Sequence, residues 1–241
     1  MVVASGFDAE EASQLALLRA RSSIAIGLHL TLTAPFSPAS SGYTPARDGA
    51  FLPLRHTLVG SVLGLLSAPA LATETEAQIE RFKAAFGHPP DFIDGHQHVH
   101  LFPGISSAVL SVAARCTPEA WVRQCGRAAV RLSDRKAFLL DLLSRRFRNR
   151  AQAYGVRTNP AFAGTYDFHT STNFADLFPK FLKGLPDGSV VMCHPGTVDA
   201  ELASNDSLTS LREREYNFFK SDAFRKLMIE QGYMLATTEI G

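Results

Sequence analysis

Short apolar runs rich in β-branched residues alternate along the chain with longer stretches whose apolar positions recur every three to four residues. This alternation is typical of βαβ units, in which parallel strands form a sheet and the intervening helices cover its faces. The pattern predicts seven strands. They are VVAS (2–5), SIAIGLHLTL (23–32), DFID (91–94), AWVRQC (120–125), GVRTN (155–159), SVVMCH (189–194) and YMLAT (233–237).

The segments between these strands carry helix signals. Thr75 followed by Gln78 is the spacing of a capping box, which predicts a helix start there, and Gly87 is placed to end that helix. Residues 34–51 (APFSPASSGYTPARDGAF) are instead rich in Pro, Ser and Gly and show no periodicity. We expect them to form a long loop after a strand, a position where loops are often functional.

The strand count favours an α/β fold, an incomplete (β/α) barrel of about seven parallel strands in one domain spanning residues 1–241. Neither an internal repeat nor a linker divides the sequence. The first strand candidate begins at Val2, so the chain starts abruptly within the pattern. We therefore expect that the first βα unit of such a barrel is missing.

The charge balance argues against several partner classes. The 24 Lys and Arg against 23 Asp and Glu give a formal net charge of +1, so no broad field favours nucleic acid or an anionic membrane. No run approaches the roughly 20 apolar residues of a membrane span. The three cysteines form no CxxC pair, and the N-terminus lacks the features of a signal peptide. We expect free thiols in a reducing compartment, the cytoplasm.

The candidate chemistry is concentrated in histidines. The stretch DGHQHVHLFPG (94–104) holds His96, His98 and His100, while His29 and His194 fall late in two other predicted strands. In parallel α/β folds the carboxyl ends of strands meet on one face, so these imidazoles predict a metal site or an acid–base site. We assign His29 and one imidazole of the 94–104 stretch, His96, to a metal, although period-two spacing alone does not select among the three.

Other histidines and one cysteine have simpler interpretations. The isolated His56, His88 and His169 are expected to be surface or satisfied core residues rather than ligands. Cys193 is adjacent to His194, but neighbouring strand residues point to opposite faces, so we expect a packed thiol and no Cys–His nucleophile.

The segments GLHLTLT, DGHQHVHLFPG and VMCHPGTVD, followed by LREREY, are similar in order and spacing to the YdjC-like carbohydrate deacetylase family. The resemblance runs from about residue 2 to the end of the chain. It implies an incomplete β/α barrel of the glycoside hydrolase/deacetylase type, a divalent metal ion (Mg²⁺ or Zn²⁺), and hydrolysis of the acetamido group of N-acetylated saccharides. It also implies a homodimer.

The resemblance assigns roles to the five histidines. His29 and the first histidine of the block, His96, match the two metal-binding imidazoles, which makes His98 and His100 supporting groups. His194 matches the active-site histidine, and an imidazole titrating near neutral pH suits protonation of the leaving amine.

Further polar residues have weaker assignments. Asp94 precedes the histidine block and either orients an imidazole or the attacking water, or caps the following turn. Arg123 and Tyr166 are expected on the same face and are candidates for contacts with sugar hydroxyls. The alternating charges of residues 212–215 indicate a solvated helix face.

One departure from the family pattern produces an alternative function. Family members open with an Asp-Asp-Phe-Gly type motif that supplies a third ligand and a base, and this sequence has no such motif. Asp8 fits a helix N-cap better than a ligand. The alternative is therefore a catalytically inactive saccharide-binding or scaffold protein. A metal-dependent phosphoesterase is a third and weaker hypothesis.

Overall fold

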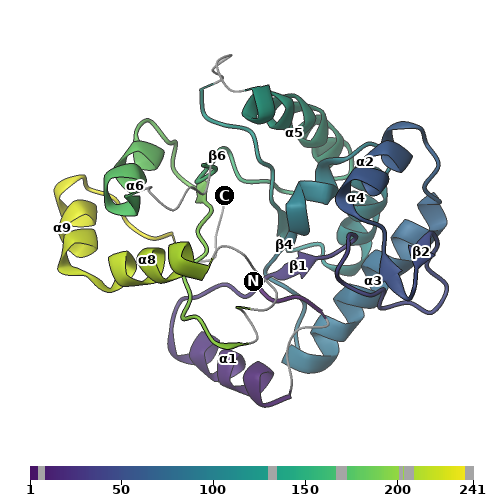
Figure 1. Cartoon of the computed structure of the whole chain (residues 1–241), viewed down its shortest axis with the longest axis horizontal. Helices are drawn as coiled ribbons and strands as arrows, with labels where there is room; N and C mark the ends of the chain where they lie inside the picture. The colour runs from purple at the N-terminus through teal and green to yellow at the C-terminus, as the bar shows by residue number, and fades with distance from the viewer. Residues whose placement is uncertain (5–8, 130–134, 167–172, 201–202, 204–208, 237–241) are drawn as a thin grey trace. The chain divides into compact units, whose positions relative to one another are not determined.

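The computed structural model describes residues 1–4, 9–129, 135–166, 173–200, 203 and 209–236 (Figure 1). Asp8 and His169 lie outside these ranges, so the predictions made for them are not addressed. The contacts divide the chain into two compact units, one of which holds the described residues up to Gly126 and from Arg135 to Asn159. The other contains Pro160–Ala236.

Three parallel strands form the centre of the first unit. They are β1 (Leu28–Leu30), β4 (Phe92–Gly95) and β5 (Trp121–Val122), hydrogen-bonded in the order β1-β4-β5. Val2 adds an isolated parallel bridge to Leu28 on the outer side of β1. Beyond β5 the ladder continues as a single bond, from the amide of Val122 to the carbonyl of Arg157.

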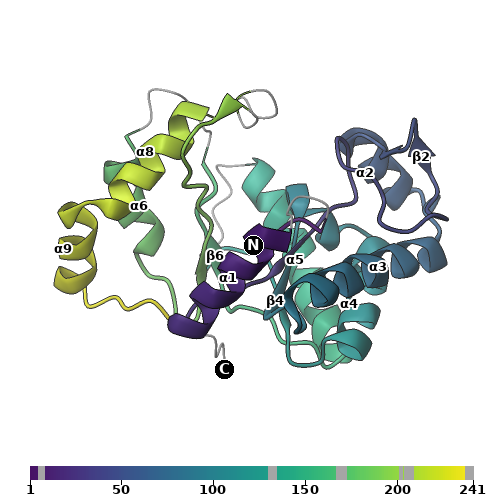
Figure 2. The ribbon, with the colours of Figure 1, turned by 90° about the horizontal axis from the view of Figure 1, so that it is seen from below.

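The helix α3 (Ala68–Phe86) covers this sheet and is itself packed against further helices. It packs against β1 and against α4 (Ile105–Cys116), which lies beside it in both views (Figures 1 and 2). Ile79 and Phe82 of α3 are fully buried, as is Ile93 of β4. The remaining helices of this unit are α1 (Ala9–Arg21), α2 (Leu54–Val62) and α5 (Arg135–Ala153).

The predicted helix start at Thr75 is wrong. The helix α3 begins earlier, after Ser67, whose side chain accepts a bond from the amide of Ala70. Gln78 lies in the buried middle of the helix, where its side chain bonds both the amide and the carbonyl of Thr31. A polar pair with capping-box spacing here satisfies a neighbouring backbone segment instead of a helix end.

The stretch 34–51 contains a hairpin in place of a featureless loop. The strands β2 (Ala46–Arg47) and β3 (Ala50–Phe51) pair antiparallel around Asp48-Gly49, both with positive φ. This is the two-residue turn that Asp-Gly favours. The segment before the hairpin is held by buried Glu74 of α3, whose carboxylate accepts hydrogen bonds from the amides of Ala39 and Ser40.

The second unit has its own small core. The strands β6 (Phe162–Ala163) and β7 (Val190–Val191) pair in parallel, and three helices accompany them, α6 (Phe174–Leu182), α8 (Thr209–Lys220) and α9 (Asp222–Glu230). Phe174, Phe178 and Phe218 are buried together, with further aromatic rings around them. Edge-to-face packing of aromatic rings stabilises such a cluster beyond the area it buries.

The predicted α/β class is confirmed by parallel strands that alternate with helices. The described residues form no strand at 155–159 or 233–236, although residues 157 and 159 bond to the β5 segment. Single-domain organisation stays a prediction. Within the described ranges, no helix combines the length and apolar character needed to cross a membrane.

Candidate functional site

The centre of the site is a pair formed across two neighbouring strands. In the parallel register His29 of β1 lies opposite Asp94 of β4, so both side chains leave the same face of the sheet. Nδ1 of His29 is 3.0 Å from Oδ2 of Asp94. The other oxygen, Oδ1, accepts bonds from the amide of Gly95 and from Nε of Arg123, each at 2.5 Å.

The Asp94 carboxyl is held in its charged form. Burial alone would raise its pKa, but the adjacent Arg123 charge and the bond from His29 outweigh burial and hold the pKa well below its usual range. A charged carboxylate can only accept hydrogen bonds. His29 therefore carries its proton on Nδ1, which leaves the lone pair of Nε2 free on the opposite side of the ring.

The ring of His96 lies next to Nε2 of His29. His96 is the first residue of the short helix η1 (His96–Leu101), and its Nδ1 is 3.4 Å from Nε2 of His29. Two nitrogens bound tetrahedrally to one Zn²⁺ at about 2.0–2.1 Å each lie roughly 3.4 Å apart. Burial and the neighbouring His29 lower the pKa of His96 to about 4, so its ring is neutral near pH 7 and can act as a ligand.

The three histidines of the 96–100 block do not share one side, as extended spacing would require. Gln97 and His98 have positive φ of 51° and 61°, which turns the chain through the left-handed region between the histidines. As a result His96 faces His29, whereas His98 and His100 contact Arg123 and its surroundings. The turn separates imidazoles that the sequence pattern placed together.

His100 is fully buried in a close-fitting position. Its Nε2 is 2.6 Å from the carbonyl oxygen of Arg123, and its ring packs edge-on against Phe147. Burial, followed by the charge of Arg123, lowers the pKa of His100 to about 4. A neutral His100 that donates from Nε2 is therefore fixed in place as part of the core around the site.

Arg123 is 4% exposed and contacts the histidine cluster, which comprises His29, Asp94, His96, His98 and His100. Its guanidinium contacts Asp94, with Nη2 also 3.1 Å from Nδ1 of His98 and Nη1 2.8 Å from Sγ of Cys125. The contact of Arg123 with sugar hydroxyls stays a prediction.

Two other predicted residues meet in the second unit. The hydroxyl of Tyr166 donates to Oε1 of Glu215 at 2.6 Å, and the backbone amide of His194 donates to Oε2 of the same residue at 2.5 Å. Glu215 is 1% exposed. It joins the two predicted site residues, and sequence reasoning missed it.

The interpretation of residues 212–215 as a solvated face is correct for Glu213 and Arg214, which are exposed, and wrong for Glu215. The spacing of Glu215 from its apolar neighbours along the helix could have predicted its burial. Glu215 follows buried Leu211 by four residues and precedes buried Phe218 by three, which is the spacing of one inward helix face. An acidic residue on that buried face indicates a carboxyl group that accepts hydrogen bonds inside the protein.

The thiol of Cys193, the residue before His194, is packed as expected from the sequence. The thiol lies against the aromatic core of the second unit, with Sγ 3.7 Å from the carbonyl oxygen of Val191. Burial and the nearby Glu215 raise its pKa to about 12, so the thiol stays protonated near neutral pH.

The structure therefore brings the predicted residues together in two sets, a histidine cluster in the first unit and the Tyr166–Glu215–His194 group in the second. Among the residues that the structure describes, no group of three or more His, Cys, Asp or Glu is placed to hold a metal ion. The pair His29 and His96 supplies two nitrogens at a suitable separation.

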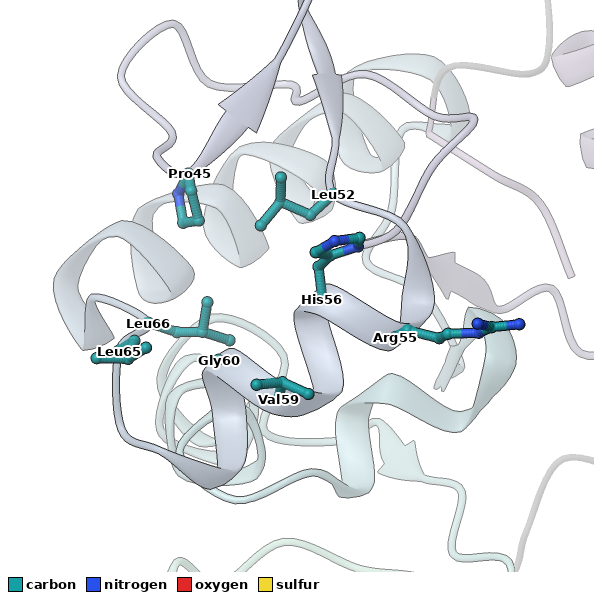
Figure 3. A pocket seen from close by; sticks show the side chains of 8 residues that line it. All are labelled: Pro45, Leu52, Arg55, His56, Val59, Gly60, Leu65 and Leu66. Atoms are coloured by element: carbon teal, nitrogen blue, oxygen red, sulfur yellow. The ribbon is translucent and has the colours of Figure 1, made fainter.

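A pocket of about 530 Å³ lies elsewhere in the first unit, beside α2 (Figure 3). His56 points toward it, while most of its walls are aliphatic. No residue of the histidine cluster lines it. Its lining residues are Pro45, Leu52, Arg55, His56, Val59, Gly60, Leu65 and Leu66.

Comparison with known proteins gives a consistent result. The family model described as YdjC-like protein matches residues 1–230. A carbohydrate deacetylase of Mus musculus is 30% identical over 214 residues, covering 81% of this chain and 67% of that protein. A carbohydrate deacetylase of Geobacillus stearothermophilus is 28% identical over 95% of this chain and 80% of its own length.

A chitooligosaccharide deacetylase of Yersinia pestis (strain Pestoides F) is 27% identical, covering 72% of this chain and 62% of that protein. Among solved structures, an Enterococcus faecalis V583 protein provisionally named for cellobiose-phosphate cleavage superimposes with a TM-score of 0.72. The match covers 95% of this chain and 82% of that one at 22% identity. It confirms the (β/α) fold class predicted from the sequence.

Proposed function

This chain belongs to the YdjC-like family, and on that premise we propose that it is a metal-dependent hydrolase that removes acetyl groups from N-acetylated sugars. The observation that carries the proposal is the 3.4 Å separation of the two nitrogens, Nε2 of His29 and Nδ1 of His96, with Asp94 holding the opposite side of the His29 ring. Carboxylate–histidine pairs of this kind orient metal ligands in proteins. The names of the deacetylase relatives support the substrate class.

In this proposal His29 and His96 hold a divalent ion, Mg²⁺ or Zn²⁺. When bound, such an ion supplies a Lewis acid that polarises an amide carbonyl and makes water more acidic. Asp94 keeps the His29 proton on Nδ1 and so keeps Nε2 available as a lone pair. His96 stays neutral because burial lowers its pKa.

His194 is assigned to protonation of the leaving amine. Amide hydrolysis requires a proton on the departing nitrogen, and imidazole is the side chain best suited to deliver it near neutral pH. Glu215 holds the backbone of His194 at its amide, which limits the positions that the ring can adopt. Tyr166 shares that carboxylate and is assigned to the same support.

The test is acetate release from chito-oligosaccharides by the protein supplied with Zn²⁺, Mg²⁺ or Co²⁺. His29→Ala and His96→Ala should each lower the rate by at least about 100-fold, because each removes a ligand. His56→Ala is the matched control, since His56 lies beside the separate pocket, and its rate should stay within about twofold.

Three results would contradict the proposal. No acetate release with any of the metals would remove the catalytic function, and saccharide binding without release would favour the alternative of an inactive sugar-binding or scaffold protein. Release of phosphate from a chromogenic ester, with acetamides left intact, would favour a phosphoesterase.

The proposal extends to the cellular state of the protein. We propose a reducing compartment such as the cytoplasm, because the three cysteines of the sequence form no CxxC pair. Homodimer formation follows from the family resemblance. Sedimentation equilibrium would test it, and a single monomeric species at micromolar concentration would count against a dimer.

A further inference from the structure

Arg123 directly contacts three members of the histidine cluster, Asp94, His98 and His100. It follows β5, and its backbone amide bonds the carbonyl of Ile93, which fixes the residue beside β4. Its guanidinium reaches Asp94 through Nε at 2.5 Å, and through Nη2 as well. Nη2 is also 3.1 Å from Nδ1 of His98. Its carbonyl oxygen is 2.6 Å from Nε2 of His100.

These contacts determine which ring nitrogen carries the proton. A guanidinium has five N–H donors and no acceptor, and it does not lose its proton in proteins. Nδ1 of His98 must therefore present a lone pair to Nη2, which puts the His98 proton on Nε2. The carbonyl oxygen of Arg123 can only accept, which puts the His100 proton on Nε2 as well.

The effect on His29 is transmitted through Asp94. Arg123 pairs with Oδ1, and Oδ2 is left to accept from Nδ1 of His29 at 3.0 Å. Because Nε of Arg123 and the amide of Gly95 both donate to Oδ1, the carboxyl of Asp94 is oriented with Oδ2 toward His29 as an acceptor. The side chain and the backbone carbonyl of Arg123 thus determine the tautomers of three rings, those of His29, His98 and His100.

We propose that Arg123 is the positioning residue of this site: it fixes the ring tautomers of His29, His98 and His100, and thereby presents Nε2 of His29 toward His96 for a cation. Only the last clause rests on the proposed function. Lysine cannot replace arginine in this role, because a single ammonium group lacks the planar fork that contacts Asp94 and His98 together.

The test is long-range proton–nitrogen NMR of the imidazole rings in the metal-free protein near neutral pH. The wild-type protein should show His29 protonated on Nδ1, and His98 and His100 protonated on Nε2. Arg123→Lys should convert His29 and His98 into mixtures of both tautomers. Asp94→Asn should change His29 and leave His98 as it is, because the His98 contact bypasses Asp94.

Controls separate this role from a general loss of structure. Arg115→Lys alters an exposed arginine paired with Glu76 and should leave all tautomers unchanged. His56, exposed beside the pocket, provides an internal reference signal. Affinity for Zn²⁺, measured by competition with a chromogenic chelator, should fall about 10–100-fold in Arg123→Lys and not in Arg115→Lys.

The outcomes are distinct. A wild-type protein with His29 protonated on Nε2 or His98 on Nδ1 overturns the inference directly, even if Arg123→Lys fails to fold. Unchanged tautomers in a folded Arg123→Lys variant, checked by circular dichroism, overturn it too. The expected tautomers in a protein that releases no acetate would support the role of Arg123 while the proposed deacetylase function fails.

Discussion

The ring of His100 lies directly over the α-carbon of Gly95, with no room for a side chain between them. A β-carbon at position 95 would come within 2.2 Å of Nδ1 of His100. The backbone at Gly95 is ordinary extended chain, with φ −129° and ψ 129°, so glycine is required here by contact and not by conformation. The glycine in DGHQHVH therefore makes space for a buried imidazole.

Gly95→Ala should consequently destabilise the protein by about 1–3 kcal/mol or more, the range for overpacking a filled core. Denaturant unfolding followed by circular dichroism measures this change. Gly42→Ala is the matched control, because a β-carbon there meets nothing within 4 Å, and it should stay within about 0.5 kcal/mol. Equal effects of the two substitutions would contradict the close contact.

Stability should decrease as the pH is lowered through the weakly acidic range. Unfolded histidine takes up a proton near pH 6.5, whereas burial keeps the pKa of His100 and of His96 at about 4 in the folded protein. Between about pH 6.5 and pH 4 the unfolded state binds more protons than the folded state. The free energy of unfolding therefore decreases as the pH is lowered. The loss from His100 alone should reach a few kcal/mol by about pH 4.

His100→Gln tests the source of this dependence. The glutamine amide can still donate to the carbonyl of Arg123, but it takes up no proton. The slope of unfolding free energy against pH should therefore flatten between about pH 6.5 and pH 4. His56→Gln, at an exposed position, should leave the slope unchanged. An unaltered slope in His100→Gln would show that His100 does not resist protonation.

The cysteines should differ sharply in reactivity. Cys125 is 2% exposed, and burial raises its pKa to about 12 despite the adjacent Arg123. The thiolate is the reactive form, so iodoacetamide should leave Cys125 unmodified in the native protein at mildly alkaline pH. Cys116, which is partly exposed, should react first. Mass spectrometry of tryptic peptides, with an unfolded sample as reference, would reveal early labelling of Cys125 if its environment is open.

Glu215 should stabilise the second unit through both of its partners. Tyr166→Phe removes the donor to Oε1 of buried Glu215 and should cost about 1–3 kcal/mol. Glu215→Leu leaves the hydroxyl of Tyr166 and the amide of His194 without their acceptor, and should cost more. Glu213→Leu, on the exposed face of the same helix, is the control and should change stability by less than about 0.5 kcal/mol.

Hydrogen exchange gives a local measure of the same contact. The His194 amide should exchange slowly in the wild-type protein and faster by at least about tenfold in Glu215→Leu, with Tyr166→Phe in between. Equal exchange in all three proteins would show that Glu215 does not hold the His194 backbone.

Sequence patterns predicted the strands that carry the histidine cluster of the first unit. Alternation of apolar runs placed β1, β4 and β5 correctly, and strand ends pointed to His29 and His96 as a pair, whose nitrogens lie 3.4 Å apart. These features depend on local periodicity, which a single sequence displays directly. The hairpin around Asp48-Gly49 was missed only because proline and serine nearby suggested a loop, although its turn residues were visible.

Contacts that depend on distant segments were beyond the sequence. Nothing in HQHVH shows that Gln97 and His98 adopt left-handed conformations, which send the histidines to different neighbours. The burial of Arg123 follows from Asp94 being opposite it in space. Gln78 likewise had the spacing of a cap but serves the backbone of Thr31, because tertiary partners override local preference.

The alignment of β1 with β4 also constrains how this sequence can change. Side chains alternate between the two faces of a strand, so inserting or deleting one residue just before Leu28 would turn His29 to the back of the sheet, away from Asp94. A two-residue change would preserve the orientation of the imidazole but shift it along the ladder. Single-residue length changes are therefore expected to disrupt the pair of His29 and Asp94 both within Leu28–Leu30 and immediately before Leu28.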